Sequence, residues 1–166
     1  SEWAGAAIVM GSSLAVLFTA EAWNRFGSPK PEWTRKLVHA GGGLACLPMP
    51  FLVSSLWTVA GMAVSFGGLL WLGGRFGFLR GVHSVRRKGS GSEFYPFAIL
   101  AMFWLARDQA WLYVASVLVL ATSDALAALV GSEYGVIRYD VDGDWKSLEG
   151  SLVFAGFANA VLYPLV

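Results

Sequence analysis

Long apolar stretches separated by short polar segments make up almost the whole chain. Six of them can be marked, and they run over Trp3–Trp23, Leu37–Ser54, Leu56–Leu72, Phe94–Ala106, Ala110–Val130 and Leu148–Val166. A helix needs about 20 apolar residues to cross the hydrocarbon core of a bilayer, and most of these stretches are close to that length. The pattern therefore predicts an all-α fold, a polytopic membrane bundle of about six transmembrane helices.

The composition agrees with a membrane protein. Charged residues make up 14% of the 166 residues and hydrophobic residues 56%, whereas an average globular domain is about a quarter charged. We expect a single integral membrane domain over residues 1–166, with the motif-bearing region at 35–151. Cys46 is the only cysteine, which excludes an intrachain disulfide and argues against a thiolate metal cluster.

Basic residues are distributed very unevenly between the polar segments. Eleven of the twelve fall in Asn24–Lys36, Gly73–Ser92 and Gly131–Ser147, and only Arg107 lies elsewhere. With six spans these three segments share one side, which the positive-inside rule assigns to the cytoplasm, with both termini outside. The first stretch lacks a basic leader, so we expect a retained span rather than a signal peptide.

One carboxylate follows directly on an apolar run. Asp124 comes at the end of the apolar run 110–123, where an ionisable group is costly and usually functional. On a helix, Asp124, Ala128, Gly131 and Gly135 lie near one small face, so a ligand can approach the carboxylate closely. The alternative is an Asp that only hydrogen-bonds a neighbouring helix across a tightly packed face.

A lysine and small residues open the last apolar stretch. In the run Lys146-Ser147-Leu148-Glu149-Gly150-Ser151, a helix would place Lys146, Glu149 and Gly150 on one face. Such a helix start, with a lysine beside free backbone N–H groups, suits phosphate binding. The alternative is interfacial anchoring by Trp145 and Lys146, with Ser147 as the helix cap. The Walker A pattern is missing.

Two further clusters lie where stretches begin. Arg35 and His39 are one turn apart and can face one pocket, and arginine suits phosphate recognition. A lone histidine there is more often a structural donor. Glu93 precedes Tyr95 and Pro96, a pattern that is also typical of an ordinary aromatic girdle at the membrane interface.

The remaining charges predict surface segments. Asp140, Asp142 and Asp144 alternate like a calcium loop but lack its glutamate at position twelve, so we expect a solvated loop. The run Arg86-Arg87-Lys88 is expected to contact anionic lipid head groups. No nucleic-acid-binding module is recognisable.

Taken in order, the clusters Arg35-Lys36-x-x-His39, Glu93-x-Tyr95-Pro96, Asp124-x-x-Ala127-x-x-x-Gly131-x-x-x-Gly135 and Lys146-Ser147-x-Glu149-Gly150-Ser151 resemble the CTP-dependent lipid kinases. That family includes dolichol and polyprenol kinases, phytol kinases and a CTP-dependent diacylglycerol kinase. The last two clusters are also similar to those of phosphatidate cytidylyltransferases. The resemblance runs from about Arg35 to the C-terminus.

The resemblance implies CTP and Mg²⁺ at the cytoplasmic face of packed helices. Asp124 would hold the metal, and Glu149 is either a second metal ligand or a base. His39 and Glu93 are the other candidates to orient or deprotonate the alcohol. The triphosphate would be bound by a larger set of residues: Arg35, Lys36, Gly131, Gly135, Lys146, Ser147, Gly150 and Ser151.

The resulting hypothesis is a kinase that transfers the γ-phosphate of CTP to a polyprenol or dolichol, a phytol-like alcohol or diacylglycerol. A cytidylyltransferase that makes a CDP-lipid is the first alternative. A small transporter with Asp124 and Glu149 on a polar path is the second. Expected partners are the lipid alcohol, the nucleotide and membrane lipids, and the small-residue faces allow homo-oligomers.

Overall fold

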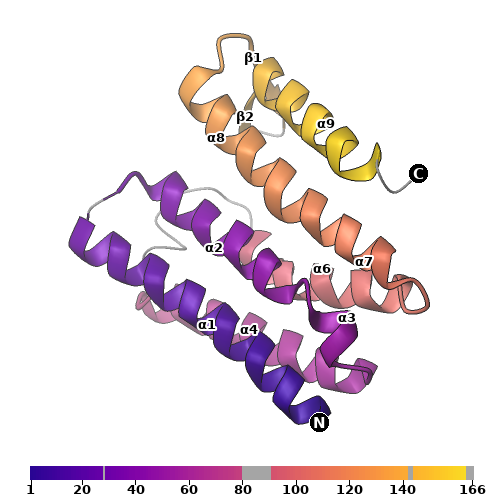
Figure 1. Ribbon diagram of the computed structural model, residues 1–166. Coiled ribbons are helices and arrows are strands. Elements are labelled where there is room, and N and C mark those ends of the chain that lie inside the picture. The colour runs from indigo at the N-terminus through magenta and orange to yellow at the C-terminus, as the bar shows by residue number, and fades with distance from the viewer. Residues whose placement is uncertain (28, 80–90, 142–143, 164–166) are drawn as a thin grey trace.

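The computed structural model describes residues 1–27, 29–79, 91–141 and 144–163. The predictions for Arg86-Arg87-Lys88 and Asp142 lie outside these residues, as does the side chain of Asp144. Within the described residues, helices account for most of the chain, which confirms the all-α prediction. Figure 1 shows the elements in order: α1 Glu2–Gly27, α2 Pro31–Cys46, α3 Met49–Leu52, α4 Leu56–Phe76, α6 Gly91–Leu105, α7 Ala110–Leu118, the π-helical turn η1 Val119–Ser123, α8 Asp124–Tyr134, β1 Arg138–Val141, β2 Asp144–Ser147 and α9 Leu148–Leu162.

Each predicted apolar stretch contains a helix, although the helices differ in length. Three are long and apolar enough to cross a bilayer, namely α1, α4 and the continuous helix Ala110–Tyr134 formed by α7, η1 and α8. Two shorter apolar helices cover Glu93–Leu105 and Leu148–Leu162. Large side chains such as Trp3, Trp57 and Phe26 are exposed, as expected for a membrane protein that faces lipid. The orientation of the chain stays a prediction.

Prolines decide where the second helix begins and ends. Pro31 occupies the first turn of α2, where a missing N–H costs nothing. The helix therefore starts before the predicted Leu37 and carries Arg35 and Lys36 within it. It ends at Cys46, and the short helix α3 follows Pro48. The predicted stretch to Ser54 is thus two helices, because proline lacks the N–H that a continuous helix needs.

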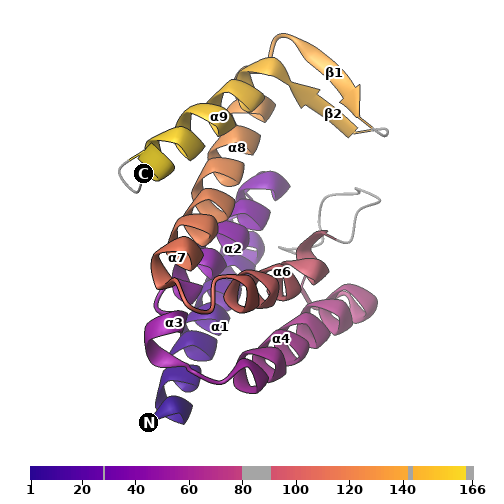
Figure 2. The ribbon, with the colours of Figure 1, turned by 90° about the vertical axis from the view of Figure 1, so that its right-hand side faces the viewer.

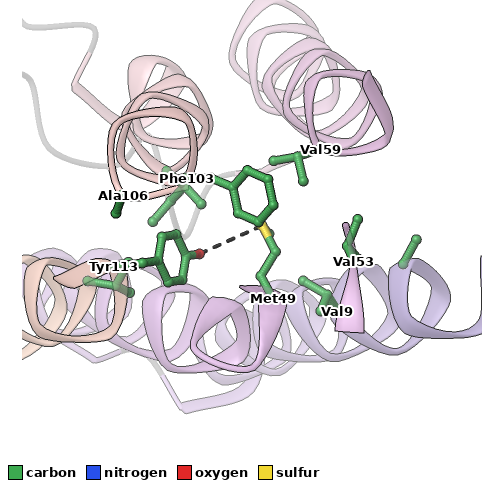
Figure 3. Close-up of a cluster of buried hydrophobic side chains, with 10 residues drawn as sticks. Val9, Met49, Val53, Val59, Phe103, Ala106 and Tyr113 are labelled. Carbon is green, nitrogen blue, oxygen red and sulfur yellow. Dashed lines mark hydrogen bonds between the residues drawn. The ribbon is translucent and has the colours of Figure 1, made fainter. Parts of the chain in front are cut away.

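A buried tyrosine joins the ends of several helices. Tyr113, only 1% exposed, donates its hydroxyl proton to the carbonyl oxygen of Cys46 at 3.0 Å, one of the carbonyls that the end of α2 leaves without a helical partner. The same hydroxyl lies 3.7 Å from Met49 Sδ (Figure 3). Phe103 packs edge-to-face on the ring, with centroids 6.0 Å apart. This cluster fixes α2 and α3 against α6 and α7.

Two predictions about the segment before the last helix are wrong. The segment expected as a solvated loop forms an antiparallel hairpin of β1 and β2, in which Tyr139 pairs with Lys146. Lys146 therefore lies on a strand rather than on the first turn of α9, because Ser147 has an extended backbone and begins the helix as its cap. Gly135 is likewise extended and lies just beyond α8, so the predicted small face ends at Gly131.

The hairpin and the α8–α9 pair form one end of the molecule. In both ribbon views they lie at the end opposite the N-terminus, and α1, α2 and α4 make up the other part (Figures 1 and 2). The helix Ala110–Tyr134 runs through both parts, since α7 packs against α2 and α6 and α8 packs against α9. Its middle, at η1, is therefore where the two parts meet.

Candidate active site

The π-helical turn η1 lies in the middle of the helix Ala110–Tyr134, directly before Asp124. A π turn interrupts the regular hydrogen-bond ladder, and such turns occur frequently at functional sites. Here the carbonyl oxygen of Leu120 lies 3.1 Å from His39 Nε2 on α2. The turn thus provides a backbone acceptor for His39 of α2. It also ends directly before Asp124, which is the first residue of α8.

Asp124, Lys36 and His39 form a compact cluster, which we call the charged centre. Lys36 Nζ lies 2.5 Å from Asp124 Oδ2 and 3.4 Å from the carbonyl oxygen of the same residue. His39 Nε2 lies 3.3 Å from the same Oδ2. The lysine side chain is 6% exposed and the aspartate side chain 43%. A buried ammonium group needs such a partner, because desolvation without one is very costly.

The contacts of His39 fix which ring nitrogen carries the proton. Both neighbours of Nε2, the Leu120 carbonyl and the Asp124 carboxylate, are hydrogen-bond acceptors. Nε2 therefore holds the proton, and the neutral ring has its free lone pair on Nδ1. The ring of Tyr95 packs on the imidazole, with centroids 4.3 Å apart. His39 is consequently held on two sides, and Nδ1 is the nitrogen that can accept a proton.

Tyr95 enters this site through space that a glycine leaves open. A Cβ atom on Gly43 would lie 2.5 Å from the Tyr95 hydroxyl oxygen and 2.5 Å from Ala121 Cβ. The hydroxyl is buried and has no hydrogen-bond partner among the described residues. Sequence reasoning included Tyr95 in a motif but not among the site residues, because an aromatic residue at a membrane interface is ordinarily an anchor.

An apolar cavity of about 290 Å³ leads to one side of the charged centre. Helices α1, α2, α4 and α6 line it with Met10, Met62, Phe66 and Ile99, among others. Its basic and acidic lining residues are all predicted site residues: Arg35, Lys36, His39, Asp124 and Lys146. The cavity is therefore apolar along most of its wall and strongly polar at one end.

A second, polar cavity of about 580 Å³ lies between α8, the hairpin and the start of α9. The predicted residues Gly131, Ser147, Gly150 and Ser151 line it. The glycines let the two helices approach closely, since a Cβ on Gly150 would lie 2.8 Å from the Ala127 carbonyl oxygen. This cavity has three basic or acidic lining residues among those described: Asp124, Arg138 and Lys146.

The two cavities meet at the charged centre, because Asp124, Ala128 and Lys146 line both. Three predicted site residues line neither cavity within the described part of the chain. Glu93 lies in the first turn of α6. Glu149 uses Oε1 to accept a hydrogen bond from the Ile137 N–H at 3.2 Å. Gly135 packs against Ser147.

Asp124 could supply one protein ligand to a magnesium ion. Among the described residues, no cluster of three or more histidine, cysteine or acidic side chains could hold a metal alone. Asp124 is the acidic residue that lines the two cavities, and the contacts of Lys36 and His39 with its carboxylate involve Oδ2. Mg²⁺ typically takes one or two carboxylates and completes its shell with phosphate oxygens and water, which this site can accommodate.

The fold and the site define a helical membrane protein whose buried charged centre separates an apolar from a polar cavity. The chain is 37% identical over 153 residues to the phytol kinase of Synechocystis sp., and the match covers 90% of this chain and 66% of the relative's length. The chain belongs to the family of lipid kinases that includes this enzyme, which confirms the resemblance drawn from its motifs. No protein-family model matches the sequence, and no solved structure does.

Proposed function

We propose that this chain phosphorylates a membrane lipid alcohol, with CTP as the phosphoryl donor and an isoprenoid alcohol such as phytol as the acceptor. One observation carries the proposal: the charged centre lies where an apolar and a polar cavity meet. A lipid alcohol and a nucleoside triphosphate need two such environments that share one reaction point. The choice of CTP rests on the family resemblance, and that of phytol on the related kinase.

The apolar cavity suits the chain of the acceptor. Burial of hydrocarbon contributes about 25 cal/mol per Å², so the chain binds along the wall while the hydroxyl stays at the polar end. Three of the four methionines line this wall, Met10, Met49 and Met62. Methionine is flexible and adapts to irregular shapes, which suits the methyl branches of an isoprenoid chain.

The polar cavity suits the triphosphate. Lys146 and Arg138 supply positive charge, and Ser147 begins α9 beside them. Phosphoryl transfer depends mainly on positioning and on neutralising phosphate charge. Magnesium bound with the triphosphate would supply part of that neutralisation, and Asp124 is the residue to hold it. Arg35 and Lys36 reach the reaction point from the side of the apolar cavity.

His39 is the best candidate for the base, because it lines the apolar cavity while Glu93 and Glu149 do not. In the proposed reaction the alcohol oxygen forms a bond to the γ-phosphorus, and the bond from that phosphorus to the β–γ bridging oxygen breaks. The hydroxyl proton passes to His39 Nδ1 and later to solvent. The products are a lipid monophosphate and CDP.

A phosphotransfer assay on the purified protein tests this function. The reaction contains labelled CTP or ATP, Mg²⁺, and phytol, a long polyprenol or diacylglycerol. We expect a labelled phytyl monophosphate and CDP from the wild type and neither from Asp124→Asn. Release of pyrophosphate with a CDP-lipid product would instead establish a cytidylyltransferase. A folded protein that binds CTP but transfers phosphate to no alcohol would overturn the proposal.

A further inference from the structure

The β-hairpin forms one wall of the polar cavity and brings an aromatic ring to it. Tyr139 on β1 and Lys146 on β2 are directly paired and both line the cavity. Directly paired residues have their Cβ atoms about 5 Å apart on the same face of the hairpin. Lys146, like Asp124, lines both cavities. Lys146 therefore lies at the junction of the two cavities, and Tyr139 lies next to it on the hairpin.

Hydrogen bonds hold Tyr139 in place through its hydroxyl. The Ser151 hydroxyl donates its single proton to the Ser147 carbonyl oxygen at 3.1 Å. The 2.6 Å contact between the Tyr139 and Ser151 oxygens must therefore use the tyrosine proton. The side chain is nevertheless 40% exposed. Tyr139 thus presents a fixed ring at the cavity, and its hydroxyl proton is already committed to the protein.

We propose that Tyr139 is the stacking surface for the nucleotide base, so that the hairpin forms the base subsite of the polar cavity. This inference rests on the proposed function, because it requires a nucleoside triphosphate as donor. Lys146 then contacts the phosphates, and the base lies farther from Asp124 on the tyrosine ring. Every nucleobase has a π face, so stacking contributes affinity for the whole donor without selecting one base strongly.

Trp145, the other aromatic side chain of the hairpin that lines this cavity, is less suited to this role. Trp145 pairs with Asp140, and this pair is the next one along the strands after the Tyr139–Lys146 pair. Successive side chains of a strand point to opposite faces, so Trp145 leaves the hairpin on the face away from Lys146. Its side chain is 65% exposed, as expected of a tryptophan at a membrane interface.

The test compares four variants of the whole protein. Tyr139→Leu keeps an apolar side chain but has no π face, whereas Tyr139→Phe keeps the ring and loses the hydroxyl. Ser151→Ala removes the anchor alone. Tyr134→Leu is the matched control, because Tyr134 is 74% exposed and lines neither cavity. For each variant we would measure the dissociation constant of Mg–CTP and the inhibition constant of inorganic tripolyphosphate.

We expect Tyr139→Leu to weaken Mg–CTP binding by about 5- to 150-fold, the usual effect of removing a stacked aromatic. Tripolyphosphate inhibition should stay within about twofold, because that probe has no base. Tyr139→Phe and Tyr134→Leu should bind CTP nearly as the wild type does, whereas Ser151→Ala, which releases the ring, should weaken CTP binding by less than Tyr139→Leu does. Equal weakening of CTP and tripolyphosphate, or no change in CTP binding, would overturn the base subsite. A wild type that binds CTP but makes no lipid monophosphate would refute the proposed kinase and leave this subsite standing.

Discussion

Replacing either partner of the Lys36–Asp124 pair removes the same ion pair, but the charged side chain that remains is buried in one case and partly exposed in the other. Asp124→Asn removes the carboxylate charge that lies 2.5 Å from an ammonium group whose side chain is only 6% exposed. Lys36→Met instead leaves an aspartate whose side chain is 43% exposed and opens onto two cavities. The free energy of unfolding should therefore fall much more in the first variant than in the second.

The magnitudes follow from the exposure of the two groups. Loss of one partner of a buried ion pair destabilises a protein by about 3–5 kcal/mol. We take about 3 kcal/mol for Asp124→Asn, because the cavities give water some access to Lys36. Lys36→Met should cost about 1 kcal/mol, since a hydrated carboxylate loses little with its partner. In the double variant no charge remains buried, so we expect a coupling energy of about 2 kcal/mol.

Unfolding followed by tryptophan fluorescence in one detergent would measure these differences, and the eight tryptophans provide the signal. The Lys30–Glu133 pair is the matched control, because its side chains are 67% and 33% exposed. Lys30→Met should change stability far less than Asp124→Asn does, because exposed ion pairs contribute little. Equal and additive losses for Asp124→Asn and Lys36→Met would refute the reasoning, because they would mean that Lys36 is no more desolvated than Asp124.

Three further predictions concern the cavities and the proposed reaction. His39→Ala should lower kcat by about 10²- to 10⁴-fold with little change in KM for CTP, as steady-state assays would show; an unchanged kcat would exclude it as the base. Ala63 lines the apolar cavity, so Ala63→Phe should occupy part of it and raise KM for phytol while KM for CTP stays unaltered. A parallel rise in both KM values would contradict separate sites for the two substrates. Gly150→Ala places a Cβ 2.8 Å from the Ala127 carbonyl oxygen and should cost about 1–3 kcal/mol in unfolding experiments; wild-type stability would show that α8 and α9 can separate freely.

The helices were predictable from the sequence, because a bilayer demands long apolar runs with internally satisfied backbones. The hairpin was not predicted, although its signal is present. Asp142-Gly143 lies between the two strands, and an Asp-Gly dipeptide between extended segments is a strong hairpin signal. The acidic residues around it favoured a solvated loop instead. The single helical face expected for Lys146 and Glu149 was wrong for the same reason.

The charged centre was predictable only in its composition. Asp124, Lys36 and His39 stood out because ionisable groups are rare in such apolar surroundings. Their mutual contacts depend on η1, and no spacing rule in the sequence marks a π-helical turn. The turn provides the Leu120 carbonyl oxygen for the His39 side chain, a contact between residues 81 positions apart in the sequence. Such a contact follows from packing and not from local propensity.

The charged centre joins stability to the proposed chemistry. Its hydrogen bonds and ion pair connect α2 to the helix Ala110–Tyr134, and the same atoms lie where both cavities end. Because the Lys36 ammonium group is poorly solvated, the ion pair is stronger than one in water, and it holds the helices at a fixed separation. That separation also sets the distance between an alcohol in the apolar cavity and a phosphate in the polar one. Substitutions at Asp124 should therefore affect folding and transfer together, whereas changes deep in either cavity should affect one substrate alone.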